Sequence, residues 1–511
     1  MRKAAIPGLA TLAILRLPSL MEPHWYTDEA GYVNVARELL DGKILYSQTW
    51  NNKPPGMLWT IALEVKLFGS SEIGLHILTL ISGLITVAAI VWAASRLYTP
   101  RRALIAGVIA GAILGLPLVD AELAVPESLM IAPLSWAGAI VLVNILRGDG
   151  TAPVRRIPRW PLAAGVLMAA AVAYQQTAIA ETSAFFFAML LAPKLMRRDA
   201  FVFLGTVAAI TLAWLTTAII TAGAGNVAFA LAGFYVAYTQ KVLPASAVGG
   251  AAHFGIAFVA GLVIAGGAIM NRHRGRVDWV LALWAGATLL VTAIAGEPYP
   301  HFLAPAVAPL TLLVAGMALP SRSRLHAGNR STLIGPALQA GGLVVAILLA
   351  KVAGVDWLPI QPVANNPHTL SDYYGGAVAA AFDPSSRTRW LNDFDYRVEG
   401  DKNVAAWIGA QGFSGDTAVV WSYDAWVYAL ADLQIDMPTP PIYNDEVLLG
   451  FGGPVEQYVA NERPVLIVVE AAAQGMYPEI GTLLASGAYV KEYESYPDTV
   501  WVRADVAQNL P

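Results

Sequence analysis

Apolar runs that are about as long as a lipid bilayer is thick recur along most of this chain. A helix rises 1.5 Å per residue, so roughly twenty apolar residues cross the ~30 Å hydrocarbon core of a membrane. Only 13% of the residues are charged, against about 25% in a soluble domain. The chain is therefore predicted to be a polytopic α-helical membrane protein with about eleven spans, at residues 4–21, 72–95, 103–119, 128–146, 160–174, 177–193, 200–222, 251–270, 278–295, 302–319 and 332–352.

Basic residues occupy every second connection between these spans. By the positive-inside rule, such connections are cytoplasmic and the connections without Lys or Arg face out. The basic residues Arg2 and Lys3 precede the first apolar run, which lacks a good signal-peptide cleavage site and is interpreted as a retained span. The pattern predicts a plasma (inner) membrane protein with a cytoplasmic N-terminus. The other basic connections are those around residues 96–102, 147–159, 194–198, 272–276 and 322–330.

The pattern changes at about residue 353. A predicted helix at 401–411 and predicted strands at 418–421, 464–470, 489–493 and 499–503 alternate as in a small α/β domain. With an odd number of spans, this domain is expected to be extracytoplasmic. We therefore predict a membrane domain at residues 1–352 and an α/β domain at residues 353–511.

Composition limits the chemistry. The chain has no cysteine, which excludes disulfides, thiolate metal sites and cysteine nucleophiles. A net charge of −4 gives no sign of nucleic-acid binding, and no metal-binding pattern such as HExxH occurs. The expected partners include membrane lipids and no nucleic acid.

A long first outer loop, residues 22–71, breaks the positive-inside rule, because it carries Arg37, Lys43, Lys53 and Lys66. Its first part predicts a helix that begins with Thr27 as N-cap and ends at Gly42. One face of this helix is apolar, as in a helix that lies in the membrane interface, and consists of Ala30, Val33, Ala36, Leu39 and Leu40. Asp28 and Glu29 then fall in the first turn. They either complement the helix dipole, or Asp28 is a base that accepts the proton of an attacking hydroxyl.

The second part of the loop places a lysine before a second helix. Pro55 suits the first position of this helix, which is predicted to run through Leu67 and end at Gly69. Lys53 thus precedes a helix N-terminus, where anions bind. The alternative is a lysine whose ammonium group reaches the lipid headgroups.

These elements occur as an ordered set. Asp-Glu-Ala-x-Tyr stands at 28–32, Leu-Leu-x-Gly-Lys-x-x-Tyr at 39–46, Lys-Pro-Pro at 53–55 and Leu-Phe-Gly at 67–69. In this order the motifs resemble the GT-C superfamily of glycosyltransferases. The nearest branch comprises the protein O-mannosyltransferase-like, aminoarabinose-transferase-like and lipopolysaccharide-core sugar-transferase-like proteins, of family 39/83 type.

The resemblance implies an inverting glycosyltransferase. Such enzymes move a sugar from a polyprenyl-phosphate donor to an acceptor hydroxyl on a protein, glycan or lipid at the outer face of the membrane. It implies Asp28 and Glu29 as the catalytic pair, and Lys53 with His301 as the donor-phosphate site. The residues implied to line the cavity are Tyr32, Trp50, Glu127, Gln175, Gln176 and Tyr299.

Several places leave alternatives open, among them His301, for which the alternative is a histidine hydrogen-bonded at a helix start. Val125 stands where the family often has Asn, and Gln175 stands where it frequently has Lys. Of the two glutamates in the outer connection 119–127, Glu127 is expected to face the cavity, and Glu122 is the one more simply explained as solvated. Glu181, inside a predicted span, costs about 2.5–3.5 kcal/mol there unless it is paired or wet.

The resemblance implies no tightly held metal and leaves a loosely bound divalent cation open. The sequence alone leaves two other functions. One is a transporter or flippase of lipid-linked sugars, although the repeated halves of such proteins are not evident here. The other is a non-enzymatic cell-envelope assembly protein.

Overall fold

The computed structural model describes residues 2–148, 159–191, 196–241, 276–295, 299–317, 370–422, 425–435, 452–471 and 478–510. The predicted spans at 251–270 and 332–352 lie outside these residues, as does the predicted domain boundary at 352/353. The other nine predicted spans all coincide with helices. Three helices, Glu72–Leu97, Pro126–Ile145 and Arg197–Ala222, are long and apolar enough to cross a membrane by length and composition.

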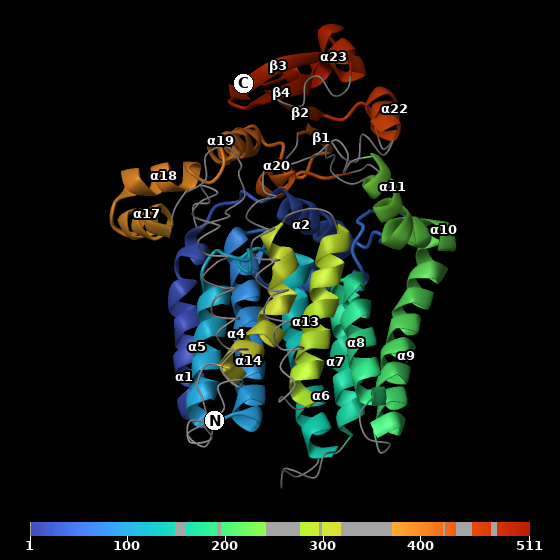
Figure 1. Cartoon of the computed structure of the whole chain (residues 1–511). Helices are drawn as coiled ribbons and strands as arrows, with labels where there is room; N and C mark the ends of the chain where they lie inside the picture. The colour runs from blue at the N-terminus through green and yellow to red at the C-terminus, as the bar shows by residue number, and fades with distance from the viewer. Residues whose placement is uncertain are drawn as a thin grey trace.

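These helices run side by side as a bundle (Figure 1). The N-terminus lies at one end of the bundle, and the C-terminal domain covers the other end. Small residues allow close packing, because a Cβ at Gly111 of α5 would lie 2.3 Å from the carbonyl oxygen of Gly8 of α1. The helices are α1 (Arg2–Leu15), α4 (Glu72–Leu97), α5 (Pro100–Gly115), α6 (Pro126–Gly148), α7 (Trp160–Tyr174), α8 (Ile179–Leu191), α9 (Arg197–Ala222), α13 (Arg276–Ala295) and α14 (Val307–Met317). Short 3-10 segments, η1 (Pro18–Met21), η2 (Gln176–Ala178) and η5 (Pro300–Ala306), lie next to α1, α8 and α14.

The first outer loop forms two helices, α2 (Thr27–Leu40) and α3 (Pro55–Phe68), as the sequence predicts. Gly42 and Gly69 follow their ends with φ of +90° and +76°, which favours glycine. Pro55 is the first residue of α3. Thr27 is not the N-cap, because the helix already begins there and Tyr26 holds the cap position.

The prediction that α2 lies in the membrane interface is wrong. Its apolar residues Ala30, Val33 and Ala36 are at most 1% exposed, because α2 packs between α3 and α20 (Trp426–Leu430) of the C-terminal domain. On its other face, Asn34 Nδ2 donates to the carbonyl of Ala425 at 2.8 Å. Protein therefore encloses α2 on both sides. Periodicity cannot reveal this, since it shows an apolar face and not the partner that covers it.

The C-terminal domain has the predicted α/β architecture. Its sheet has the strand order β1-β2-β4-β3, with β1 parallel to β2 and the other pairs antiparallel. The strands are β1 (Ala418–Trp421), β2 (Leu466–Glu470), β3 (Tyr489–Ser495) and β4 (Asp498–Arg503). The helices are α17 (Leu370–Phe382), α18 (Pro384–Asn392), α19 (Arg397–Ala410), α20, α22 (Gly452–Glu462), α23 (Pro478–Ala485) and α24 (Ala504–Ala507). All residues of β1 and β2 are buried, as their apolar sequences predict.

A further short segment links α9 to the outer end of the molecule. It consists of α10 (Ala224–Ala228), the π-helical turn η4 (Phe229–Gly233) and α11 (Phe234–Lys241). The segment rises beside the first outer loop in Figure 1. Its aromatic side chains reach that loop, as described next.

Candidate active site

Asp28 lies in the first turn of α2, at the end of the bundle that the C-terminal domain covers. Its side chain is half-buried. One turn later, Tyr32 Oη donates to Asp28 Oδ2 at 3.4 Å, which is long for such a bond. Burial, followed by the charge of Asp28, raises the pKa of Tyr32 well above its usual value. The tyrosine therefore stays protonated and donates to the carboxylate.

Glu29 has a different environment from its neighbour. It is 2% exposed, and its Oε1 accepts a hydrogen bond from the backbone N–H of Ala124 at 2.5 Å. Burial raises the pKa of Glu29 to about 8. This side chain therefore attaches α2 to the outer connection 119–127.

Lys53 is held by its own loop. Tyr46 Oη donates to the carbonyl of Lys53 at 2.8 Å, and the Lys53 N–H donates to Asn51 Oδ1 at 3.1 Å. The ammonium nitrogen lies 5.9 Å from the centroid of the Tyr235 ring. Burial acts to lower the pKa of Lys53, but Tyr235 and the negative charges nearby raise it overall. Lys53 is therefore charged.

Those nearby charges are Asp28 and Glu127. Glu127 is a buried residue in the first turn of α6, and its Oε1 accepts a hydrogen bond from Gln175 Nε2 at 2.7 Å. The first turns of α2 and α6 and the loop before α3 thus bring two carboxylates and one ammonium group near one another. Gln175 is the residue that ends α7 and orients Glu127.

Two other predicted residues face the α10–α11 segment. The Trp50 ring packs against Phe234, with centroids 5.3 Å apart, and against Phe229 at 6.2 Å. Gln176 Nε2 donates to the carbonyl of Leu231 at 3.5 Å, so it does not share the contact of Gln175. Tyr235 of the same segment, which the sequence did not single out, donates to the carbonyl of Asn52 at 3.3 Å.

His301 lies in a cluster of rings at the start of η5. It stacks on Tyr299, with centroids 5.4 Å apart and planes 11° apart, and meets the edge of Tyr26 at 6.4 Å. Its Nδ1 is 3.8 Å from Asp120 Oδ2, and neither buried atom has a hydrogen-bond partner among the described residues. Asp120 was not identified from the sequence. Its φ of +43° is unusual for a residue with a side chain.

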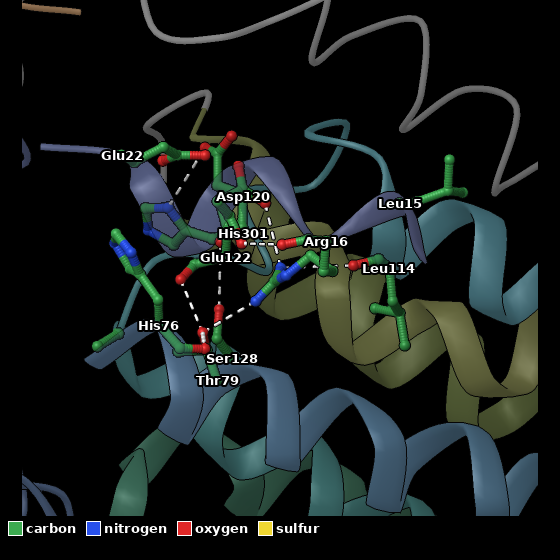
Figure 2. A network of polar contacts seen from close by, with 12 residues as sticks. Leu15, Arg16, Glu22, His76, Thr79, Leu114, Asp120, Glu122, Ser128 and His301 are labelled. Atoms are coloured by element: carbon green, nitrogen blue, oxygen red, sulfur yellow. Dashed lines mark hydrogen bonds and ion pairs between the residues drawn. The ribbon is translucent and has the colours of Figure 1, made fainter. Parts of the chain in front are cut away.

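A buried polar network fixes the connection that carries Asp120 and Glu122 (Figure 2). Arg16 Nη1 lies 3.4 Å from Glu122 Oε2, with both side chains at most 6% exposed. Arg16 Nη2 donates to Thr79 Oγ1 at 2.9 Å, and Thr79 Oγ1 donates to the carbonyl of Glu122 at 2.8 Å. The interpretation of Glu122 as a solvated residue is therefore wrong, because Arg16, distant in sequence, pairs with it inside the protein.

Glu181 also has a partner inside the bundle. Thr288 of α13 donates to its Oε1 at 2.8 Å. One oxygen of this carboxyl group is thus hydrogen-bonded to a neighbouring helix, while the buried Oε2 has no hydrogen-bond partner among the described residues. No group of three or more His, Asp or Glu side chains that could hold a metal occurs in the part of the chain that the structure describes.

An apolar groove lies beside the loop that holds Lys53. It has a volume of about 540 Å³ and runs between α3, α7, α9 and residues 42–46. Its lining includes Tyr46, whose hydroxyl contacts Lys53, and Pro55, Gly56, Trp59 and Trp214. Trp59 is 54% exposed on the surface of the bundle. The groove therefore connects that surface with the neighbourhood of the lysine.

The chain is similar to a known protein family and to solved structures. Residues 52–220 match the model of a family described as dolichyl-phosphate-mannose-protein mannosyltransferase. The crystal structure of ArnT from Cupriavidus metallidurans bound to undecaprenyl phosphate has a similar fold, with a TM-score of 0.62 and 18% identity over 97% of each chain. The chain therefore has the fold of this ArnT, and its residues 52–220 are similar to the mannosyltransferase family. The apo structure of the same ArnT gives a TM-score of 0.62 at 17% identity over 98% of each chain. No curated protein sequence matches the chain.

The likeness to ArnT confirms the predicted fold class, and the family match agrees with the enzyme class that the first-loop motifs predict. The matched segment begins at Asn52, next to Lys53, and includes α3 and the groove residues from Pro55 to Ala218. At 17–18% identity, the likeness to ArnT establishes the fold and leaves the substrates to be argued from the site.

Proposed function

We propose that this chain is a GT-C glycosyltransferase that moves a sugar from a polyprenyl-phosphate donor to an acceptor hydroxyl, with inversion at the anomeric carbon. The observation that supports this best is the charged Lys53 near Asp28 and Glu127, beside an apolar groove. A lipid phosphate needs both a cation and an apolar surface. The similar structure of ArnT is described as binding undecaprenyl phosphate.

The reaction is a single displacement. Asp28 accepts the proton of the acceptor hydroxyl as its oxygen attacks the anomeric carbon. The bond between that carbon and the phosphate oxygen breaks, and its electron pair leaves with the phosphate. Because attack comes from the face opposite the leaving group, the configuration inverts. Lys53 stabilises the charge that develops on the phosphate, which is usually the largest contribution to such catalysis.

Neighbouring residues position these two groups. Tyr32 donates to Asp28 and keeps the carboxylate aimed, and Gln175 does the same for Glu127. Glu29 holds α2 against the connection 119–127, so we assign it a positioning role in place of direct catalysis. His301, whose Nδ1 lies 3.8 Å from Asp120 Oδ2, provides a second contact for the donor phosphate.

The remaining predicted residues shape the two substrate sides. The rings of Trp50 and Tyr299 lie on opposite flanks of the first outer loop, against the α10–α11 segment and His301 respectively. Gln176 attaches that segment to the start of α8. We place the prenyl chain in the groove and the acceptor, a protein, glycan or lipid, on the side of the C-terminal domain.

The proposed location is the outer face of the plasma (inner) membrane. The basic connections lie toward the cytoplasm in this orientation, as the positive-inside rule requires. The site and the C-terminal domain lie at the end of the bundle opposite to the N-terminus (Figure 1). Polyprenyl-phosphate sugars presented in the outer leaflet would reach the groove directly.

The test uses the full-length protein in lipid nanodiscs with polyprenyl-phosphate donors that carry radiolabelled sugars. The protein should release polyprenyl phosphate in step with transfer of the label, and Asp28→Asn should abolish both. Asp41→Asn, an exposed carboxylate just after the end of α2, is the matched control and should act as wild type. Full turnover by Asp28→Asn would contradict the assignment. Repeating the assay with a chelator tests whether a loosely bound divalent cation takes part.

A further inference from the structure

A helical hairpin of the C-terminal domain presents large apolar side chains outward. It consists of α17 and α18, joined at Asp383. Phe382, the last residue of α17, is 87% exposed, and Val378 one turn earlier is 61% exposed. Apolar side chains that are this exposed on a folded helix mark a surface that binds an apolar partner.

The face of the hairpin opposite to Phe382 and Val378 is packed against protein, and this packing fixes the position of the hairpin. Tyr373, Ala377 and Trp390 are buried there, and a Cβ at Gly376 would lie 2.2 Å from Trp390 Cδ1. At the tip, Asp383 Oδ2 accepts a hydrogen bond from the N–H of Ser386 at 2.8 Å and begins α18. The outward position of Phe382 is therefore built into the hairpin.

The hairpin is attached to the outer end of the first span. Tyr374 Oη donates to the carbonyl of Leu15, the last residue of α1, at 2.9 Å. Tyr373 Oη donates to Glu22, just after η1. In Figure 1 the hairpin projects sideways beyond α1, at the height where the bundle meets the C-terminal domain.

The direction of the apolar face follows from helix geometry. Residues four apart are neighbours on a helix surface, so Tyr374, Val378 and Phe382 form one row along α17. The row begins at the end of α1, and α1 itself exposes Ile14 at 64% and Leu17 beside it at 58%. Since these two belong to the lipid-facing surface of the bundle, the row on α17 continues that surface outward.

We propose that the row Val378–Phe382 of α17 inserts into the outer leaflet of the membrane and anchors the C-terminal domain over the lipid beside α1. Apolar side chains at the edge of the hydrocarbon, carried on a helix parallel to the surface, are the means by which interfacial helices bind. Lipid is the occupant because the surface is continuous with that of a span. A second copy of the chain is the competing occupant.

The absence of cysteine makes the test direct, because a single introduced cysteine is the only labelling site. Phe382→Cys is labelled with a nitroxide in lipid nanodiscs, and its relaxation by oxygen, which concentrates in lipid, is compared with that by a water-soluble nickel chelate. Ile14→Cys on α1 is the lipid-facing reference. Val490→Cys on β3, 41% exposed and far from the bundle, is the water-facing reference.

The proposal requires the label at position 382 to favour oxygen over nickel, as at position 14. A nickel preference like that at position 490 would overturn it. So would dipolar broadening between labels at position 382 that disappears on dilution with unlabelled protein, because that identifies a second copy as the partner. Val378→Cys repeats the measurement one turn earlier, with the same expected preference. None of these results depends on transfer activity.

Discussion

Breaking the ion pair between Arg16 and Glu122 tests how the connection 119–127 is held. Arg16 lies next to the end of α1, and both side chains are buried with the guanidinium 3.4 Å from the carboxylate. Replacing Glu122 by Leu leaves the guanidinium with the Thr79 hydroxyl, at 2.9 Å, as its nearest acceptor. Because a charge left without its partner inside a protein is costly, the single substitution should destabilise the protein by about 3–5 kcal/mol.

The companion variant separates charge from packing. Changing Arg16 to Met together with Glu122→Leu removes both charges and fills most of the space. Replacement of a buried pair by apolar side chains is often nearly neutral, so the double variant should recover most of the loss. The coupling between the two sites should therefore be of the order of 2 kcal/mol or more.

Unfolding of wild type, Glu122→Leu, Arg16→Met and the double variant in the same detergent, followed by tryptophan fluorescence, measures these differences. A cost below about 1 kcal/mol for Glu122→Leu would mean that the pair contributes no more than a surface ion pair does. Additive effects in the double variant would refute the claim that the two side chains act on each other. Either result would remove the network of Figure 2 as the support of the loop.

Three further predictions concern other contacts. Asp498→Asn should raise the melting temperature, and by more at pH 9 than at pH 5. Burial raises the pKa of Asp498 to about 9, so the native protein holds a proton that the unfolded chain loses above about pH 4. The stability of the wild type therefore falls as the pH rises from about 4 to 9, and the asparagine variant lacks this loss. Gly56→Ala should destabilise the contact of α3 with α7 by about 1–3 kcal/mol in a denaturation assay, because the new Cβ would lie 2.7 Å from the carbonyl oxygen of Ala173. Arg37→Ala should cost more stability than Asp432→Ala, since Arg37 is 13% exposed in its side chain and Asp432 is 74% exposed; equal costs would contradict this.

The features that the sequence predicts well are local ones. A run of apolar residues marks a span or a buried strand wherever the chain goes next, so the bundle helices and the four strands are found at nearly their predicted positions. The same holds for Pro55 at the start of α3 and for Gly42 and Gly69 after the helix ends. The proline and the glycines determine the conformation of their own backbone, without any distant partner.

The features that the sequence does not predict depend on distant partners. Glu122 is paired with a residue 106 positions away, and α2 is covered by α20, nearly 400 positions away, as in the contact from Asn34 to Ala425. Asp120 beside His301 has no motif of its own. The first-loop motifs predicted the residues that we propose for the site, whereas their burial and their partners required the fold.

The central claim is that Asp28 and Lys53 do different work on one donor, and it is tested by measuring donor binding and turnover separately in Asp28→Asn and Lys53→Ala. Equilibrium binding of a fluorescent polyprenyl phosphate gives the first quantity, and single-turnover release of the labelled sugar gives the second. Asp28→Asn should bind the lipid phosphate as wild type does and transfer no sugar, whereas Lys53→Ala should lose affinity for it. If Lys53→Ala bound the lipid phosphate normally, or if Asp28→Asn transferred sugar at the wild-type rate, the account of this site would be contradicted.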